Sequence, residues 1–417
     1  MFDIRAFKGP VILIAIFALA AFIRLINFGN RVVFGPEQAM SLIVSGSYIT
    51  EKLSLLGQMY FRESSAGHSL FSGAIFNYLL VPIMFFLRYN PIYITFVFTL
   101  INLFTGFALY RAFSKLVDKR VAIFALIYFL FDATMINHSL FIWNYNLLPL
   151  VFVGCLWSLV KAKKGDFHWV LVLGLFCGLG INIQYLFALP AFVFFGYLLF
   201  RFRSFLVSCI FMFGVVLGNF TIVLFDLRHN FYHLQTTIEY LKDVYKGEQG
   251  FTFQYYHFIY LVPLVAVAFG MVTNKVWLKN KLLATSLVIV FLVFNLLSID
   301  FTKAQGMPKD LSTQDVLKAS FIISQFVADE TFNVVETYDF DARAHVLRYP
   351  LIYMHDKVNL LSIKDYEVSP SIFVLSPLNY DYNNPTAWEM KVYQPFDVRL
   401  VQAVNANWGV FRLTKMQ

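Results

Sequence analysis

Long apolar runs separated by short polar links fill the chain as far as residue 299. A helix needs about 20 apolar residues to cross the roughly 30 Å hydrocarbon core of a bilayer. Runs near that length recur between Val11 and Ile299, so the pattern predicts a mostly α protein built as a polytopic transmembrane helix bundle. The nine predicted spans are residues 10–28, 91–110, 121–136, 147–160, 168–184, 190–200 with its flanks, 205–225, 255–273 and 282–299.

The composition agrees with a bilayer as the main solvent of this chain. Hydrophobic residues make up 59% of the 417 residues and charged residues only 14%, against about 25% charged in ordinary soluble domains. A single water-soluble core is therefore excluded. The apolar run after Lys8 extends to Phe28 without a small-residue cleavage site, and it is expected to be an uncleaved first span.

The links between the predicted spans are of two kinds, and these alternate from Arg111 onward. Links rich in Lys and Arg cover 111–120, 161–164, 201–203 and 275–281, whereas 132–146, 182–189 and 226–254 carry no basic excess. The positive-inside rule places the basic links in the cytoplasm. The net charge of +8 is therefore ascribed to topology and not to nucleic-acid binding. We expect a multi-pass plasma-membrane protein with a cytoplasmic N-terminus.

Residues 29–90 are expected to form an outer loop on the extracytoplasmic side. The basic residues before the first span and after this region all belong in the cytoplasm. An odd number of crossings must therefore separate residue 29, which follows the first span, from residue 111, and only one of the two apolar stretches between them should cross. The stretch 70–88 is predicted to be an interfacial or re-entrant helix on the outer side. A surface helix is predicted from Pro36 to about Leu56, with a polar face of Gln38, Ser41, Ser45 and Lys52.

Residues 300–417 carry 11 Lys or Arg and 14 Asp or Glu, without any apolar run long enough to span. They are predicted to form a small extracytoplasmic soluble domain of α/β or α+β type, so the chain divides into 1–299 and 300–417. Ser312 and Asp315 have the spacing of a capping box ahead of an amphipathic helix. Short β-like runs follow at 332–335, 372–375, 398–404 and 409–413.

Ionisable and amide side chains on the predicted outer side are the candidates for chemistry, because charged groups inside a membrane cost about 2.5–3.5 kcal/mol each. Glu37 opens the surface helix, where the positive end of the helix dipole favours a carboxylate. A plain helix-terminal charge is the alternative. The other candidates are Asp132, His138, Asn144 and Asn146 in one outer link, and Asp226, Arg228 and His229 in another. For the first of these links the alternative is a water-exposed loop, and for the second it is contact with lipid headgroups.

Motifs for soluble cofactors are absent from the sequence. There is no phosphate-binding loop, dinucleotide fingerprint, serine-nucleophile elbow or HExxH motif. The three cysteines, Cys155, Cys177 and Cys209, lie inside apolar segments without metal-ligand spacing. The sequence therefore predicts no metal-ligating set.

Ordered blocks of the chain resemble bacterial polytopic glycosyltransferases of the GT-C superfamily. The resemblance is closer to the branch that includes protein mannosyltransferases and the aminoarabinose transferase of lipid A. It covers roughly residues 10–160 and is carried by 22–25, 34–39, 55–57, 73–80 with Pro82, and 138–149.

The resemblance implies an inverting transfer of a sugar from a polyprenyl-phosphate donor to a hydroxyl or amine of a lipid, glycan or protein acceptor, on the extracytoplasmic face of the membrane. It makes Glu37 the general base and sets Gln38 beside it among the substrate-binding residues. The departing lipid phosphate needs cationic help. Candidates for that help are Arg31, Arg62, Arg228 and His229.

The chain departs from the family pattern at three positions. Gly35 replaces the first acid of the usual pair, and a single carboxylate is a poor divalent-cation site. No cofactor is assigned, and the use of a divalent cation is left open. In the second block Leu140 stands where the family usually has Arg, and Tyr145 stands where it usually has Pro.

Two other kinds of protein share this topology. A transporter or lipid flippase is one alternative, although mid-span charges that would line an ion pathway are scarce. A non-catalytic scaffold in an envelope-assembly complex is the other, and the missing acid at Gly35 is consistent with it.

Overall fold

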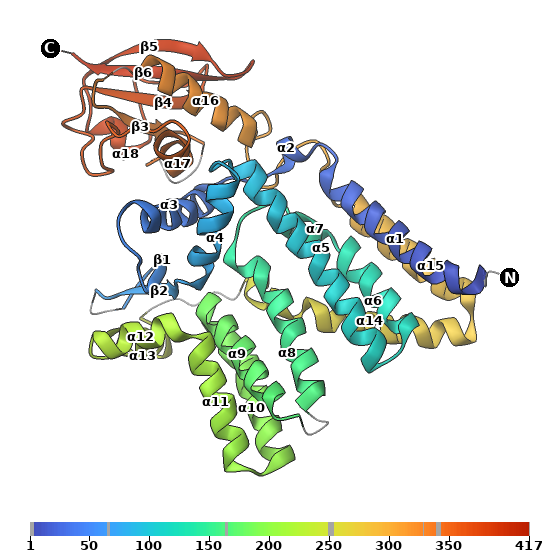
Figure 1. The fold of residues 1–417 in the computed structure, drawn as a ribbon. Coiled ribbons are helices and arrows are strands. Elements are labelled where there is room, and N and C mark those ends of the chain that lie inside the picture. The colour runs from blue at the N-terminus through green and yellow to red at the C-terminus, as the bar shows by residue number, and fades with distance from the viewer. Residues whose placement is uncertain are drawn as a thin grey trace.

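The chain folds into a helical bundle with a small mixed sheet at one end (Figure 1). The computed structural model describes residues 4–64, 67–162, 166–248, 254–327, 329–338 and 343–416. The apolar part contains α1 (Ile4–Leu25), α2 (Phe28–Arg31), α3 (Pro36–Thr50), α4 (Ile75–Phe86), α5 (Pro91–Leu116), α6 (Lys119–Phe131), α7 (Ala133–His138), α8 (Leu148–Ala162), α9 (His168–Ile183), α10 (Ala188–Phe202), α11 (Phe205–Gly218), α12 (Phe220–Arg228), α13 (Tyr232–Lys246), α14 (Val262–Lys279) and α15 (Lys281–Leu297). The short 3₁₀ segments are Asn144–Leu147, Tyr185–Phe187 and Tyr255–Leu261.

Several of these helices are able to cross a membrane, and the chain is a multi-pass membrane protein. Among the described residues, four helical segments are long and apolar enough to span: Pro91–Leu116, Asn144–Ala162, Tyr185–Phe202 and Tyr255–Lys279. Shorter apolar helices cover Pro10–Leu25, Ile75–Phe86, His168–Ile183 and Lys281–Leu297. The count of nine spans stays a prediction.

The predicted span 205–225 is broken. Helices α11 and α12 meet at an angle of 82°, with Asn219 between them. The side chain of Asn182 donates to Asn219 Oδ1 at 3.0 Å and to Thr221 Oγ1 at 2.9 Å. These hydrogen bonds pair the polar side chains at the break between α11 and α12. A hydropathy pattern alone does not reveal such a break. The link predicted at 226–254 also contains a regular helix, α13.

Helices α9 and α11 cross at unusually close range because both carry glycines four residues apart. A Cβ atom added at Gly174 would lie 2.2 Å from the carbonyl oxygen of Phe211, and one added at Gly178 would lie 2.2 Å from that of Val215. The glycines of α11, Gly214 and Gly218, face the backbone of α9 in the same way. Small residues at this spacing allow helix backbones to approach closely in membranes.

The region 29–90 contains a β-hairpin that the sequence patterns did not predict. The surface helix begins at Pro36 as predicted, but it ends at Thr50 and not near Leu56. Strand β1 (Leu56–Glu63) then pairs antiparallel with β2 (Ser69–Gly73). The predicted helix 70–88 is therefore wrong in its first residues, and α4 begins only at Ile75. Residues 69–73 form a strand and not the start of a helix because they pair with β1, in a ladder that contains register shifts.

Residues 313–416 form a small α+β unit, as the sequence predicts. The sheet has the order β3-β4-β6-β5, with β3 and β4 parallel and the other pairs antiparallel. Its elements are α16 (Thr313–Phe326), β3 (Asn333–Glu336), α17 (His345–Tyr353), β4 (Ser371–Pro377), α18 (Trp388–Lys391), β5 (Phe396–Ala403) and β6 (Trp408–Lys415). The Ser312 hydroxyl accepts from the backbone of Asp315 at 3.2 Å, so the predicted cap of α16 is confirmed.

This C-terminal unit packs on the segment that leads into α3. Thr313 Oγ1 donates to the carbonyl oxygen of Val32 at 2.7 Å. From α17, the Tyr353 hydroxyl donates to the carbonyl oxygen of Ile43 at 3.2 Å, and the Tyr353 ring covers Gly46. Helix α3 is therefore held between the sheet unit and the bundle.

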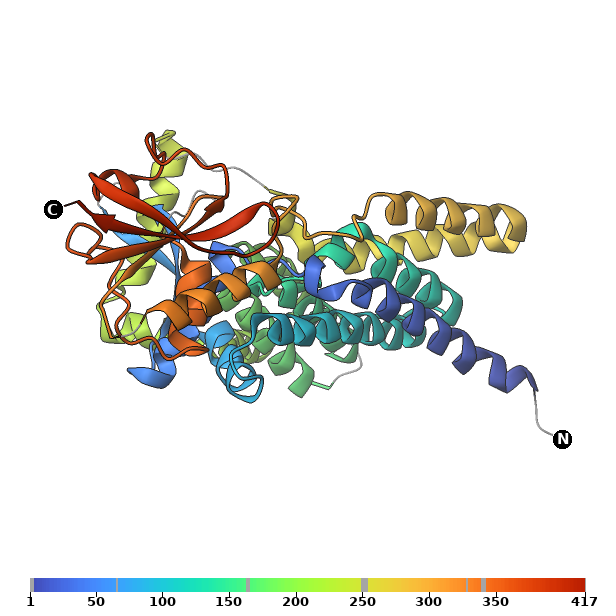
Figure 2. The ribbon, with the colours of Figure 1, turned by 90° about the horizontal axis from the view of Figure 1, so that it is seen from above.

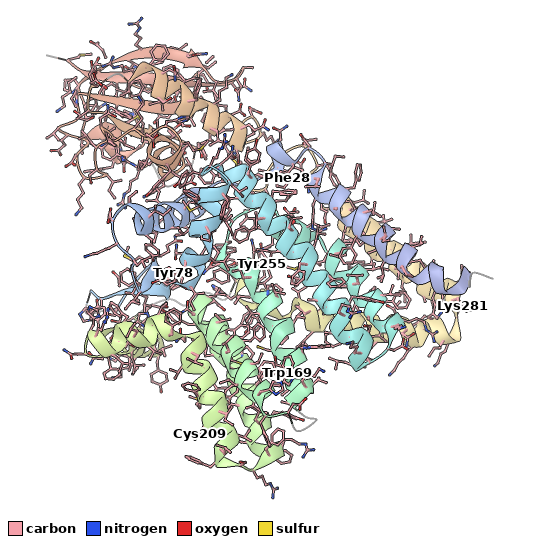
Figure 3. The ribbon with its side chains drawn as sticks, viewed as in Figure 1. Phe28, Tyr78, Trp169, Cys209, Tyr255 and Lys281 are labelled. Atoms are coloured by element: carbon pink, nitrogen blue, oxygen red, sulfur yellow. The ribbon has the colours of Figure 1, made fainter. Side chains whose placement is uncertain are left out.

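Basic side chains gather at helix ends remote from the sheet. Lys115 at the end of α5 and Lys161 at the end of α8 both lie over the Trp157 ring, at 5.4 and 5.6 Å from its centre. The N-terminus and the turn between α14 and α15 lie at the end of the molecule opposite the sheet, in both views (Figure 2). Figure 3 marks that turn by Lys281. Which end faces the cytoplasm stays a prediction.

Candidate active site

A short bridge joins the two chain segments that the sequence singles out. Val33 forms a parallel bridge with Phe141, and the Val33 backbone N–H donates to the carbonyl oxygen of Leu140 at 3.0 Å. The residues that precede α3 therefore lie beside the link that follows α7. This contact brings Glu37 near Asn144, although they are far apart in sequence.

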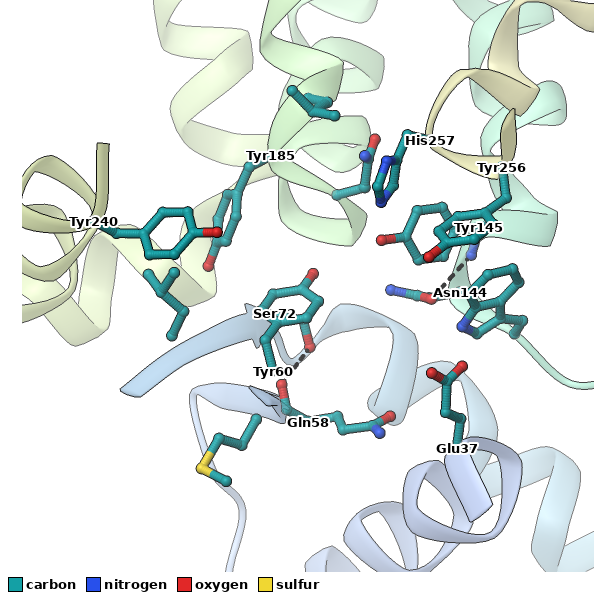
Figure 4. A pocket seen from close by; sticks show the side chains of 15 residues that line it. Glu37, Gln58, Tyr60, Ser72, Asn144, Tyr145, Tyr185, Tyr240, Tyr256 and His257 are labelled. Carbon is teal, nitrogen blue, oxygen red and sulfur yellow. Dashed lines mark hydrogen bonds between the residues drawn. The ribbon is translucent and has the colours of Figure 1, made fainter. Parts of the chain in front are cut away.

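A cavity of about 300 Å³ opens at this junction (Figure 4). Its walls come from the start of α3, the β-hairpin, the link 143–145, residues 184–186 after α9, helix α13 and the 3₁₀ segment Tyr255–Leu261. The lining residues are Glu37, Gln58, Met59, Tyr60, Leu70, Ser72, Trp143, Asn144, Tyr145, Gln184, Tyr185, Leu186, Tyr240, Tyr256 and His257. A volume of this size lies at the lower end of the range for small-ligand sites.

Glu37 is the acidic residue of the cavity. It lies in the first turn of α3, where the unpaired backbone N–H groups and the helix dipole favour an ionised carboxylate. Its side chain is exposed, and its carboxylate points into the cavity toward Asn144. Among the described lining residues it is the sole carboxylate, and none of them is Lys or Arg.

Aromatic rings form the wall that faces Glu37. The Trp143 ring packs against the rings of Tyr145 and Tyr256, with centroids 4.4 and 4.8 Å apart. His257 packs edge-on against Tyr256 at 4.5 Å. Flat aromatic faces beside hydroxyl and amide groups are suited to a ligand that has both apolar and polar faces.

Asn144 is fixed by backbone contacts on both sides of its amide. Its Nδ2 donates to the carbonyl oxygen of Ile183 at 2.9 Å, and its Oδ1 accepts from the backbone of Tyr145 at 3.0 Å. The first bond ties this link to the end of α9. The amide is thereby held at the cavity edge without side-chain freedom.

The β-hairpin supplies the polar floor of the cavity. Gln58 accepts from the Ser41 hydroxyl at 2.6 Å, which orients its amide from α3. The Ser72 hydroxyl donates to the carbonyl oxygen of Gln58 at 3.2 Å across the hairpin. Burial, followed by the neighbouring Tyr185, raises the pKa of Tyr60 above its ordinary value. The Tyr60 phenol therefore stays neutral and able to donate.

His138 and Asn146 support the aromatic wall from behind. Asn146 Nδ2 donates to the carbonyl oxygens of His138 and Phe141 at 2.6 and 2.8 Å, so its Oδ1 is left to accept from His138 Nδ1 at 2.9 Å. Burial lowers the pKa of His138 to about 4, against the opposing effect of its bond to Asn146. The neutral imidazole stacks on Trp143 at 5.9 Å. Neither His138 nor Asn146 lines the cavity.

The other predicted site residues lie outside this cavity. Gln38 Oε1 accepts from the backbone N–H of Gly35 at 3.0 Å, so it caps α3. Asp132 caps α7 by accepting from Met135 at 3.0 Å. Asp226 accepts from the backbone of His233 at 2.8 Å and so anchors the start of α13.

Arg228 and His229 also lie away from the Glu37 cavity, exposed at the end of α12. The imidazole of His229 stacks on Phe225 at 4.2 Å, and its Nδ1 contacts the carbonyl oxygen of Phe225 at 2.9 Å. The side chain of Arg62 lies outside the described part of the structure. The site predicted from sequence thus contributes Glu37 and Asn144 to the cavity.

Sequence reasoning missed most of the lining. Tyr185 comes from the 3₁₀ segment after α9 and Tyr240 from α13, and Gln58 and Ser72 come from an unpredicted hairpin. The clustering of aromatic residues beside a polar group at 143–145 and 255–257 was an available signal. Neither cluster by itself indicates a cavity, because the two segments meet only in the folded structure.

The lining residues do not form a donor set for a divalent cation. Within the described residues no group of three or more His, Cys, Asp or Glu is placed to hold a metal ion. Of the lining residues that the structure describes, only Glu37 offers a carboxylate, and Gly35 offers no side chain. We therefore derive no step of the chemistry through a metal.

The bundle, the hairpin and the C-terminal sheet unit together define a polytopic membrane protein with an ArnT-like fold. The structures it resembles include ArnT from Cupriavidus metallidurans bound to undecaprenyl phosphate, with a TM-score of 0.61, 11% identity, and coverage of 97% of this chain and 98% of that one. The apo structure of the same protein has a TM-score of 0.58 at 10% identity and covers 98% of both chains. No protein-family model and no curated protein matches the sequence.

Proposed function

We propose that this chain is an inverting membrane glycosyltransferase that takes its sugar from a polyprenyl-phosphate-linked donor. The observation that carries the proposal is the Glu37 carboxylate, which points into a cavity walled by aromatic rings and amide and hydroxyl groups. The presence of undecaprenyl phosphate in ArnT, which has the same fold, supports a lipid phosphate as the carrier of the sugar.

In the proposed reaction Glu37 acts as the general base. It accepts the proton of the acceptor hydroxyl or amine while that oxygen or nitrogen bonds to the anomeric carbon of the sugar. The bond between the anomeric carbon and the phosphate oxygen breaks on the opposite face, and polyprenyl phosphate leaves with the electron pair. Configuration at the anomeric carbon is therefore inverted. The positive end of the helix dipole at the start of α3 favours a negative charge at this position, which suits the role of base.

The roles of the other lining residues follow from their chemistry. Asn144 and Gln58 are positioned to hydrogen-bond sugar hydroxyls, because hydrogen bonds to Ile183 and Ser41 fix the orientation of their amides. Trp143 and Tyr256 offer the rings on which the apolar face of a sugar packs. The acceptor in this proposal is a lipid, glycan or protein on the extracytoplasmic face.

The test is transfer of sugar from a polyprenyl-phosphate sugar pool by membranes that contain the protein. Glu37→Gln keeps the shape of the side chain and removes the base, and it is expected to lower transfer about 10²- to 10⁴-fold. Glu51→Gln, at the other end of α3 and outside the cavity, is the matched control and should transfer normally. Equal transfer by the Glu37 and Glu51 variants would remove Glu37 from catalysis. A transporter or scaffold would yield no covalent product in any variant.

The proposed topology sets the cavity and residues 300–417 outside the cytoplasm. Single cysteines at Lys115 and Asp310 in a cysteine-free background test it directly. We expect an impermeant thiol reagent to label the cysteine at 310 in intact cells and to label the one at 115 only after the cells are broken. Labelling of both positions in intact cells would contradict this orientation.

A further inference from the structure

Helices α12 and α13 lie side by side at the end of α11, next to the β-hairpin (Figure 1). Helix α10 belongs to a segment that is long and apolar enough to cross a membrane, and α11 packs against α10. Because α12 turns away from α11 by 82°, it leaves the direction in which these helices cross. We call α12 and α13 together, residues 220–246, the helix platform.

One side of α13 is an exposed apolar stripe. Its members recur at intervals of three and four residues, which places them on one face of a helix. Each is between 44 and 93% exposed, and they are Leu234, Ile238, Leu241 and Tyr245. Contiguous apolar surfaces of this kind mark contacts with a membrane or with another protein.

The stripe follows a stretch of chain that already faces lipid. Exposed apolar side chains continue from the end of α11 through α12, at Val216, Leu217, Phe220, Leu224 and Leu227. On the crossing helix α11 such side chains have lipid as their solvent. The continuity of these exposed residues from α11 into the helix platform favours the bilayer, and not a second protein, as the phase that covers the stripe.

The opposite side of α13 is buried against the Glu37 cavity. Tyr240 is buried and lines that cavity. His233 is buried as well, and its Nε2 lies 2.6 Å from the Tyr185 hydroxyl and 3.1 Å from the carbonyl oxygen of Phe71 in β2. One helix, about 10 Å thick, therefore separates the cavity from the stripe.

The charges of the helix platform predict insertion without a preference for anionic lipid. Residues 220–248 carry three Lys or Arg and four Asp or Glu, so a negative surface does not attract them. Lys242 and Lys246 are exposed and each follows a member of the stripe by one residue, so they lie at its edge. Lysines at the edge of an apolar face extend their ammonium groups toward headgroups and water.

We propose that the helix platform lies in the plane of the membrane interface, with the stripe of α13 among lipid acyl chains and Lys242 and Lys246 in the headgroup layer. The partner of this surface is the lipid bilayer itself. Amphipathic helices of this kind bury their apolar face about 5–10 Å into the boundary between headgroups and acyl chains. The inference does not depend on the proposed function, because it concerns the side of α13 that faces away from the cavity.

Spin labels on the full-length protein in phosphatidylcholine liposomes test this position. Single cysteines are introduced into a cysteine-free background as Leu234→Cys, Ile238→Cys and Leu241→Cys on the stripe, with Lys242→Cys and Lys246→Cys at its edge as matched controls. All five side chains are exposed, so the labels replace no buried contact. We expect oxygen, which concentrates in the bilayer, to relax the stripe labels, at a depth of about 5–10 Å. A water-soluble nickel chelate should relax the edge labels instead.

Equal relaxation of the stripe and edge labels by the nickel chelate would place the stripe in water and overturn the inference. Dipolar coupling between stripe labels on two molecules would overturn it as well, because a second copy would then cover the stripe. The depth should stay the same when phosphatidylglycerol is added to the liposomes. Insertion that occurs only with phosphatidylglycerol would contradict a hydrophobic contact.

Discussion

The crossing of α9 and α11 leads to the most quantitative prediction. Replacing Gly178 by Ala places a Cβ atom 2.2 Å from the carbonyl oxygen of Val215, where ordinary contact begins at 3.4 Å. The obstacle is backbone, so no side-chain rotation relieves it, and the helices must separate by more than 1 Å. Overpacking of this kind costs about 1–3 kcal/mol. Gly178→Ala should therefore destabilise the protein by about that amount.

Gly196→Ala is the matched control for this variant. Gly196 lies inside α10, in another apolar helix, and a Cβ atom there meets nothing within 4 Å. The exchange should be neutral or stabilising by up to about 1 kcal/mol, because glycine costs a helix backbone entropy. The pair thus separates steric contact from helix propensity.

The measurement is reversible unfolding of each purified variant in mixed micelles with increasing dodecyl sulfate. Adding Gly174→Ala to Gly178→Ala should cost less than the sum of the single effects, since the helices have already separated. Because α9 leads directly into Gln184 and Tyr185 in the cavity wall, sugar transfer should fall as well. Equal stability of Gly178→Ala and Gly196→Ala would refute the close crossing.

Three further predictions concern the support of the site. Burial lowers the pKa of His138 to about 4, against about 6.5 in the unfolded chain, so on acidification the unfolded chain takes up the proton first. The contribution of His138 to the free energy of unfolding should be full above pH 6.5 and fall by up to about 3 kcal/mol as the pH drops to 4. Unfolding curves of His138→Gln should lack this dependence on pH. Gly46→Leu should displace the Tyr353 ring, which a Cβ atom would approach to 2.2 Å, and so shift α3 and Glu37. We expect sugar transfer to fall about 10- to 100-fold while the protein stays in the membrane. Unchanged transfer would contradict the role of this contact. Asn144→Ala should raise KM for the donor more than it lowers kcat, because a fixed amide that binds both ground and transition states is lost.

Local patterns in the sequence predicted the membrane-spanning character of the chain and the start of α3. Apolar length is a property of one segment at a time, so it can be read without knowing the neighbours. The cap at Ser312 and the strands of the C-terminal sheet follow from equally short-range signals, namely a hydroxyl-to-backbone bond and short runs of β-forming residues. Glu37 could be chosen because it heads a helix after the first apolar run.

The remaining features depended on partners distant in sequence. The strand at Leu56–Glu63 has no strong pattern of its own and exists because Ser69–Gly73 pairs with it. The break at Asn219 follows from the side chain of Asn182 on a different helix. Candidates such as Asp226 and His138 are polar for structural reasons, since one caps α13 and the other supports Trp143.

The sequence by itself determined that this chain enters a membrane, that a small α+β unit follows its apolar part, and that a carboxylate stands at the head of a helix after the first apolar run. These outcomes rest on short-range free energies of transfer and capping, which add up segment by segment. Only the tertiary structure decided which side chains face Glu37, because the bridge of Val33 to Phe141 and the docking of Tyr353 on α3 join residues more than a hundred positions apart. Such contacts form only once the whole bundle has closed.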